Sequence, residues 1–219
     1  ADFSNYKRTL MSDATTSLHP VFEKNLQALF QKNAYLATDL FKIEGNTRFE
    51  VYQGKDSVDI NLYDTEKEKV FYNTPVQDAV EFIENSRKDY LIPYRYFFGM
   101  GNGIIIQMLL KDPQIQRIIV IEPNLEVLYI ILHMLDFSET ILNNRLFIES
   151  YQQFNYPKAD YFLTSSQSQF YAKLFELETT SPYYDEYYSD EMKEIVSIMA
   201  KAFESTILGY GNCAIDSLM

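Results

Sequence analysis

The sequence contains no tryptophan, two histidines and a single cysteine among its 219 residues. One cysteine excludes an internal disulfide, which fits a reducing compartment such as the cytoplasm. No metal-ligand spacing is present, and the two histidines, His19 and His133, stand in unrelated contexts. A metal site and a Ser-His-Asp arrangement are therefore not expected. His133 lies in an apolar stretch and is expected to be a packed histidine.

Long apolar runs and positive charge are also scarce. The longest apolar stretch, Val127 to Leu135, is interrupted by His133 and is far shorter than the roughly 18 residues that a membrane-spanning helix needs. We expect no membrane span and no signal peptide. Nineteen Lys and Arg residues stand against 31 Asp and Glu, for a formal net charge of −12. A surface this acidic repels phosphate backbones, and the basic residues are scattered, so nucleic-acid binding is not expected.

Hydrophobic residues make up 47% of the chain, which predicts a folded core. Residues 1–90 are expected to form an N-terminal part with one helix over Ser17 to Phe41, identified by apolar residues at helical spacing. Arg48 to Asn73 alternates apolar and polar residues between turn segments, which predicts a small antiparallel β-meander. Thr74 and Pro75 then begin a helix that extends to Arg87.

Residues 91–208 change to an alternating β and α pattern. Strands are predicted at Tyr94–Phe98, Arg117–Ile121, Arg145–Glu149 and Asp160–Thr164, and helices at Asn102–Lys111, Leu125–Leu135, Gln167–Glu178 and Glu186–Leu208. Such alternation predicts a Rossmann-like, methyltransferase-like α/β fold, with a mostly parallel sheet and helices on both faces. The tyrosine-rich run from Tyr183 to Tyr188 is interpreted as a turn. Gly209 to Asn212 is interpreted as a helix stop, with 209–219 as the start of a linker.

The most informative motif is a glycine loop between the first two elements of this pattern. Gly99, Gly101 and Gly103 alternate with Met100 and Asn102, and Glu122 ends the next strand, 19 residues after Gly103. Glycines at such a turn allow close approach of a ligand to the first turn of a helix, and an acidic residue at this position can accept hydrogen bonds from ribose. Gly99, Gly101, Asn102, Gly103 and Glu122 thus form a candidate site for a nucleotide or an S-adenosylmethionine-like ligand.

Two interpretations of the loop remain open. The spacing G-x-G-x-G favours the adenosylmethionine type of loop over the dinucleotide type, but Phe97 stands where methyltransferases usually carry an acid. The alternative is that the glycines serve only tight packing of helix on strand. Two weaker candidates lie at predicted strand ends: Glu149-Ser150, and the segment from Thr164 to Gln167.

Three segments carry a family resemblance: Tyr96 to Ile104 with Gly-Met-Gly-Asn-Gly, Ile119 to Glu126 with Glu-Pro, and Leu135 to Ser138 with Asp-Phe-Ser. In this order they resemble the amino-terminal domain of the motility accessory factor family of bacterial flagellin glycosyltransferases. The resemblance is strongest over 94–150. The segment from Leu208 to Leu218 is similar to the approach to that family's central domain.

The resemblance implies a cytoplasmic protein that acts on flagellin before export. It also implies transfer of a nonulosonic acid, pseudaminic or legionaminic acid, from a CMP-sugar to flagellin Ser or Thr hydroxyls. In this family the transferase activity is attributed to the central, sialyltransferase-like domain, so catalytic residues are not carried over to this chain. The implied partners are flagellin and the remaining domains of the same polypeptide.

Three functions compete at this point. The first is a non-catalytic domain of a flagellin glycosyltransferase. The second is an enzyme similar to S-adenosylmethionine-dependent methyltransferases or aminopropyltransferases, for which the meander ahead of a Rossmann unit is suitable. The third is a pure interaction module with an acidic surface and an aromatic content of 16%.

Overall fold

The computed structural model describes residues 6–9, 19–86 and 92–216, with 207–216 described as backbone only. Its first helices are α1 (Pro20–Lys32) and α2 (Ala34–Phe41). The single helix predicted over 17–41 is therefore divided at Asn33, because the Asn33 side chain accepts a hydrogen bond from the Leu36 N–H (3.2 Å) and begins a new helix. Residue 17, the expected start, lies outside the described residues.

Strands before and after these helices form a small antiparallel sheet, and the predicted β-meander is confirmed. It consists of β1 (Lys7–Thr9), β2 (Phe49–Gln53), β3 (Ile60–Asp64) and β4 (Lys69–Val70), paired in that order. The strand β1 was not predicted. Helix α3 (Pro75–Ser86) follows β4, as its proline at the first helical position indicated.

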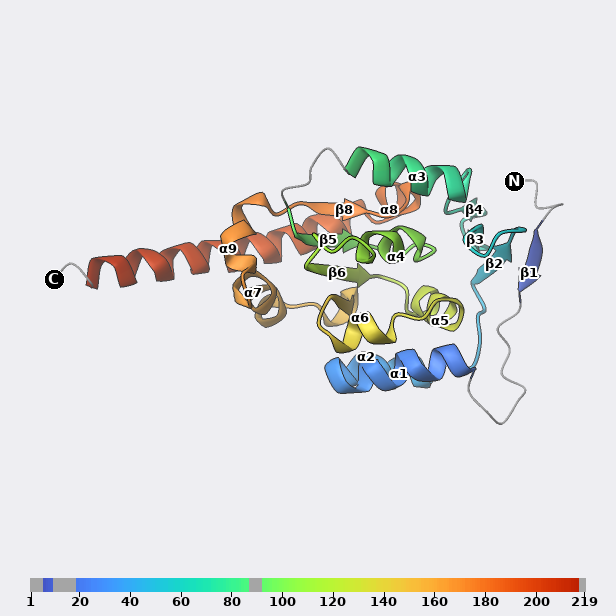
Figure 1. Ribbon diagram of the computed structural model, residues 1–219, viewed down its shortest axis with the longest axis horizontal. Coiled ribbons are helices and arrows are strands. Elements are labelled where there is room, and N and C mark those ends of the chain that lie inside the picture. The colour runs from blue at the N-terminus through green and yellow to red at the C-terminus, as the bar shows by residue number, and fades with distance from the viewer. Residues whose placement is uncertain (1–5, 10–18, 87–91, 217–219) are drawn as a thin grey trace.

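The second sheet is parallel and has the order β7-β6-β5-β8. Its strands are β5 (Tyr94–Phe98), β6 (Arg117–Glu122), β7 (Leu146–Ser150) and β8 (Leu177–Thr179), and the elements between the first three are α4 (Ile104–Leu110), α5 (Leu125–Met134) and α6 (Ser138–Leu142). Every residue of β6 is buried, as expected when both faces of a parallel sheet are covered. The predicted Rossmann-like α/β class is confirmed, and Figure 1 shows the sheet at the centre of the molecule.

The fourth strand is not where the sequence predicted it. Asp160–Thr164 forms the end of helix α7 (Tyr156–Thr164), because Asn155 caps that helix and Pro157 lies in its first turn. A 3₁₀ turn, η2 (Tyr151–Gln153), precedes α7, and a 3₁₀ helix, η3 (Ser168–Leu174), follows it. The edge strand β8 overlaps the last two residues of the segment predicted as helix, Gln167–Glu178, and ends one residue beyond it. The apolar run behind the wrong strand prediction is Tyr161 to Leu163, and a run this short does not show by periodicity whether it is strand or helix.

The C-terminal part is more helical than predicted. The tyrosine run forms α8 (Pro182–Tyr187) rather than a turn, and α9 (Ser189–Asp216) continues through Gly209 and Gly211, so the predicted helix stop is wrong. A glycine costs a helix about 1 kcal/mol and need not end it. In Figure 1 the last turns of α9 project away from the body. That 209–219 leads to a further domain stays a prediction.

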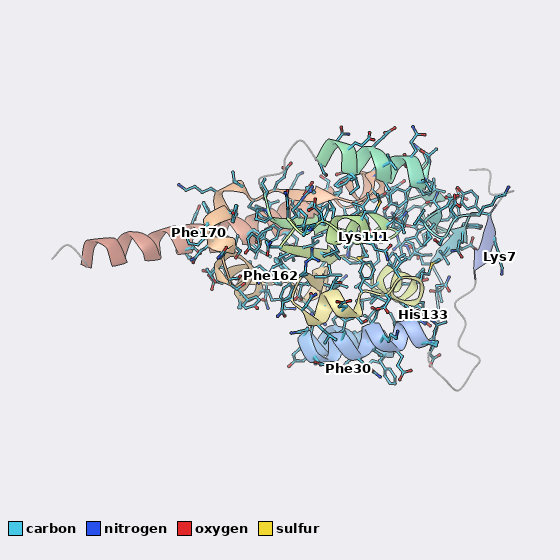
Figure 2. All side chains as sticks on the ribbon, viewed as in Figure 1. Lys7, Phe30, Lys111, His133, Phe162 and Phe170 are labelled. Carbon is cyan, nitrogen blue, oxygen red and sulfur yellow. The ribbon has the colours of Figure 1, made fainter. Side chains whose placement is uncertain are left out.

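One hydrophobic core runs through both parts of the chain, from Phe22 to Ala202. Asn25 of α1 is fully buried and joins the two parts: its amide donates to the carbonyls of Leu132 and Leu135 (both 2.8 Å) and accepts from the Phe137 N–H (2.8 Å). Next to it His133 is packed on α1, as expected (Figure 2). The domain division near residue 90 stays a prediction. None of the helices in the described part of the chain is both long and apolar enough to cross a bilayer.

Candidate functional site

The glycine loop connects β5 to α4, as predicted, and all three glycines adopt a left-handed backbone. Their φ angles are 94° at Gly99, 58° at Gly101 and 75° at Gly103. L-residues with a side chain rarely adopt these angles, so glycine is required by the backbone itself. The whole loop is buried, including Met100 and Asn102. Phe97, at the position where methyltransferases usually carry an acid, is fully buried in β5.

Glu122 ends β6 directly beside this loop, and its carboxylate is completely buried. One oxygen accepts hydrogen bonds from the Met100 N–H and the Tyr184 hydroxyl (both 2.7 Å), and the other accepts from the Asn124 N–H (2.9 Å). Burial raises the pKa of Glu122 from its ordinary 4.5 to about 7, although these three donors oppose the shift. Since its nearest donors belong to the protein, Glu122 is fully engaged within the chain.

Two tyrosine hydroxyls occupy the position where a ligand would meet the loop. Tyr184, from α8, accepts a hydrogen bond from the Gly101 N–H (3.0 Å) while it donates to Glu122. Tyr72, which follows β4, accepts from the Asn102 N–H (3.2 Å). Both side chains are buried. The backbone donors that a phosphate or nucleoside would use are therefore satisfied by the protein itself.

The contact between loop and tyrosines is closer than any side chain on the glycines would allow. A Cβ on Gly99 would lie 2.2 Å from the Tyr184 ring, and one on Gly101 would lie 2.1 Å from the Tyr72 hydroxyl oxygen. Thr180, just after β8, donates to the Gly99 carbonyl (2.9 Å) from the same side. The close approach that the glycines allow is thus used by side chains of this chain.

Asn102 extends the network to the antiparallel sheet. Its amide nitrogen donates to the Ile60 carbonyl in β3 (2.9 Å), and its amide oxygen accepts from the Ile104 N–H at the start of α4 (3.1 Å). The five predicted site residues are therefore brought together, in a buried joint between the two sheets and α8. A nucleotide or adenosylmethionine at this loop stays a prediction, and it would have to displace Tyr184 and Tyr72.

The weaker candidates have structural partners as well. Glu149 at the end of β7 is buried and forms an ion pair with Lys158, and the Asn33 amide donates to it (3.0 Å). Burial raises the pKa of Glu149 despite Lys158. The segment from Thr164 to Gln167 follows a helix rather than a strand, so its expected place at the carboxyl edge is wrong. Among the described residues, no group of three His, Cys, Asp or Glu side chains is placed to hold a metal.

Sequence reasoning missed a second buried polar cluster, which includes Tyr183, the residue before Tyr184 in α8. Asp64 is fully buried and bonds to the Arg48 guanidinium (2.6 Å) and the Tyr183 hydroxyl (2.6 Å). Burial alone would raise the pKa of Asp64, but the hydrogen bonds from Arg48 and Tyr183 outweigh it and hold the pKa below its ordinary value. The sequence signal for both clusters was Ser181-Pro182, a helix start that places Tyr183 and Tyr184 in one helical turn.

These observations define an α/β domain of the Rossmann type whose glycine loop is covered by the chain's own tyrosines. Residues 63–208 match the family model described as the glycosyltransferase Maf N-terminal domain, and the chain belongs to this family. Maf stands for motility accessory factor, the family that the sequence motifs resemble.

A solved structure supports the fold. The chain is similar to the MAf glycosyltransferase from Magnetospirillum magneticum AMB-1, with a TM-score of 0.51 and 13% sequence identity. The alignment covers 84% of this chain and 35% of that one, so the chain spans about a third of the length of the solved protein. At this identity the likeness shows the fold alone. Among proteins with curated functions, no match was found.

Proposed function

We propose that this chain is the amino-terminal, non-catalytic domain of a bacterial flagellin glycosyltransferase. The remaining domains of the polypeptide transfer a nonulosonic acid, pseudaminic or legionaminic acid, from a CMP-sugar to Ser or Thr hydroxyls of flagellin in the cytoplasm. Membership of the Maf N-terminal family supports the glycosyltransferase assignment. The motifs between residues 96 and 138 support the flagellin acceptor and the sugar.

The observation that supports a non-catalytic role is the covered glycine loop. A Rossmann-type site binds phosphate or nucleoside through free N–H groups at the loop and an available acid after the second strand. Here Tyr184 and Tyr72 accept from the N–H groups of Gly101 and Asn102, and Tyr184 also donates to Glu122. The parts of a cofactor site are present, but they hold the two sheets and α8 together.

A supporting role for this domain is to position flagellin or to help assemble the full enzyme. Several large apolar side chains are exposed on its surface, including Tyr35 (82%) and Phe170 (74%). Aromatic residues are enriched among the anchors of protein interfaces, and a net charge of −12 favours basic partner surfaces. A domain that binds proteins rather than a cofactor is consistent with these features.

The direct test is a transfer assay with the chain alone and with the complete parent protein. Each is incubated with a CMP-activated nonulosonic acid and unglycosylated flagellin, and the flagellin mass is measured. We expect the mass increase of one or more sugars with the parent and none with the chain. Transfer by the chain alone would overturn the proposal. In a parallel pulldown, failure of both proteins to retain flagellin would remove the positioning role and leave assembly.

The competing function is an adenosylmethionine-dependent enzyme, and the observation in its favour is that Glu122 and all three loop glycines are present. Calorimetry with S-adenosylmethionine and with its decarboxylated form distinguishes the two. We expect no binding heat with either compound, because Tyr184 fills the site. Binding of either one with a dissociation constant in the micromolar range would support the enzyme.

A further inference from the structure

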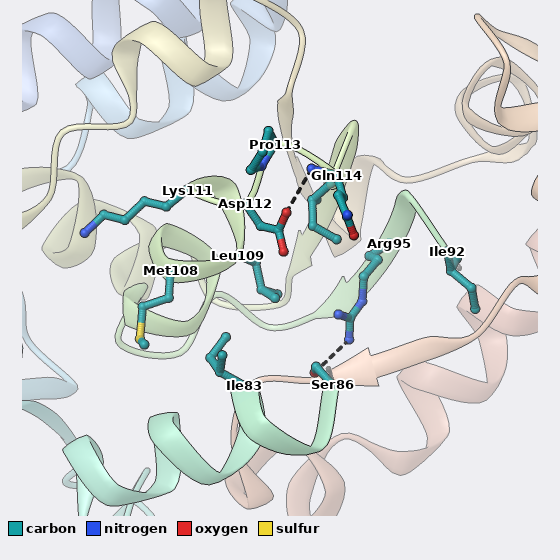
Figure 3. A pocket seen from close by; sticks show the side chains of 11 residues that line it. Ile83, Ser86, Ile92, Arg95, Met108, Leu109, Lys111, Asp112, Pro113 and Gln114 are labelled. Atoms are coloured by element: carbon teal, nitrogen blue, oxygen red, sulfur yellow. Dashed lines mark hydrogen bonds between the residues drawn. The ribbon is translucent and has the colours of Figure 1, made fainter. Parts of the chain in front are cut away.

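A pocket lies at the opposite end of the parallel sheet from the glycine loop. It is bounded by the end of α3, the start of β5, the end of α4 and the 111–115 segment that leads to β6 (Figure 3). Its volume is about 410 Å³. Pockets that bind small molecules are usually about 300–1,000 Å³, mainly apolar, with a few polar groups that orient the ligand. This one has the right size for a compact ligand.

Apolar side chains from three parts of the fold form most of its wall. Ile83 comes from α3, Met108 and Leu109 come from α4, and Pro113 and Ile115 come from the following segment. Figure 3 shows Ile83, Met108 and Leu109 around one side of the space. A branched or unbranched hydrocarbon group would replace water against this wall, and removal of its apolar surface from water favours binding.

Arg95 supplies a fixed hydrogen-bond donor to the same space. Its Nε donates to Glu178 (2.8 Å), and one terminal nitrogen, Nη2, donates to Ser86 (3.2 Å) and to Glu178. No acceptor among the described residues bonds to the other terminal nitrogen, Nη1. In Figure 3 the guanidinium points between Ile83 and Leu109. Only 10% of the Arg95 side chain is exposed, so this donor is held in place by Glu178 and Ser86.

Asp112 supplies an acceptor on the facing wall. One of its carboxylate oxygens accepts from the Gln114 N–H (2.9 Å), which fixes the side chain, while the other is drawn toward Leu109 in Figure 3. The pocket therefore presents a guanidinium donor and a carboxylate acceptor beside an apolar wall. The charge of Arg95 is balanced by Glu178, and the lining also holds one acid, Asp112, and one base, Lys111. The formal charges around the pocket therefore cancel, so a ligand with no net charge is favoured.

We propose that this pocket binds an apolar α-amino acid, such as leucine, methionine or phenylalanine. The α-carboxylate accepts from Nη1 of Arg95, and the α-ammonium donates to Asp112. The side chain of the amino acid packs on Ile83, Met108 and Leu109. A zwitterion satisfies both polar groups at once, whereas a simple carboxylate or amine leaves one of them without a partner.

The proposal is tested by calorimetry on the chain with leucine and two analogues that each lack one charged group. These are 4-methylpentanoate, without the ammonium, and 3-methylbutylamine, without the carboxylate. We expect leucine to bind at least about tenfold more tightly than either, since a charge-assisted hydrogen bond is worth about 1.5 kcal/mol or more. Equal binding of all three, or no binding of leucine at 10 mM, overturns it.

Variants locate the binding in this pocket. Asp112→Asn keeps the acceptor for Gln114 but removes the charge, so it should weaken leucine about tenfold and leave 4-methylpentanoate unchanged. Met108→Trp fills the cavity and should abolish the binding of leucine and of 4-methylpentanoate. Glu84→Gln, an exposed charge on α3 that does not line the pocket, is the matched control and should bind leucine as the unaltered chain does. An equal loss in the Asp112 and Glu84 variants, with melting temperatures unchanged, refutes the site.

Discussion

The buried carboxyl of Glu122 allows a quantitative test of the joint at the glycine loop. Burial places its pKa near 7, against 4.5 for an ordinary glutamate. The folded state therefore binds this proton more tightly than the unfolded state does. The contribution to stability is fully present below pH 4.5 and is lost as the pH rises through 7. At about 1.4 kcal/mol per pKa unit, the total loss is about 3 kcal/mol.

Glu122→Gln removes this titration while it keeps a neutral group with an acceptor oxygen for the Met100 N–H and the Tyr184 hydroxyl. We expect the unfolding free energy of the unaltered chain, relative to the variant, to fall by about 2.5 kcal/mol between pH 5 and pH 8. Titrations common to both proteins cancel in this difference. A pH-independent cost of the amide shifts the difference in unfolding free energy by a constant amount and leaves its dependence on pH unchanged.

The assay is equilibrium unfolding in urea, followed by circular dichroism at half-unit steps of pH. Glu84→Gln, with its exposed side chain, serves as the control and should give a flat difference. A difference that does not change with pH for Glu122→Gln as well would show that burial does not raise the pKa of Glu122. A difference that rises with pH would show that the hydrogen bonds from Met100, Tyr184 and Asn124 outweigh burial and stabilise the charged form, and the raised pKa of Glu122 would then be wrong.

Three further predictions concern the same joint and its neighbour, each measured as the free energy of urea unfolding at pH 7. Tyr184→Phe should cost about 1–3 kcal/mol, because it leaves the Gly101 N–H buried without an acceptor. Tyr161→Phe, at a half-exposed ring, should cost nearly nothing. Gly101→Ala should cost about 2–4 kcal/mol, because the residue needs φ of 58° and the new Cβ would meet the Tyr72 hydroxyl at 2.1 Å. Adding Tyr72→Phe removes that hydroxyl and should recover part of the lost stability. Asp64→Asn should cost about 3 kcal/mol. This loss of unfolding free energy relative to the unaltered chain should shrink as the pH falls below the ordinary carboxyl pKa, because Asp64 then becomes protonated. A loss independent of pH would contradict the lowered pKa of Asp64.

Local signals in the sequence were sufficient to predict the strands and the helix around the glycine loop. The alternating glycines stand between a predicted strand and a predicted helix, which indicates a turn of this kind, and the run Ile118 to Ile121 is apolar enough to be buried on both faces. The order β5, loop, α4, β6 was therefore predictable, and so was the position of Glu122. The same holds for the β-meander, whose period of two is strict and whose turns are polar.

Predictions failed where two structures share one local pattern. Asp160–Thr164 is a short apolar run that suits a strand, and Asn155 with Pro157 decides for a helix only when the whole segment is considered. The strand β8 is three residues long and pairs with β5 over 80 positions away, so nothing in its own sequence identifies it. Its place at the edge of the sheet depends on that distant pairing.

The local sequence decides that Gly99, Gly101 and Gly103 form a turn with a left-handed backbone, because backbone sterics act between neighbouring residues. It does not decide what the turn holds. The hydroxyl that accepts from Gly101 belongs to Tyr184, 83 positions later in the chain, and the one at Asn102 belongs to Tyr72, 30 positions earlier. Hydrogen bonds over such separations form only when the core brings the elements together. That packing turns a fingerprint for ligand binding into a joint between two sheets.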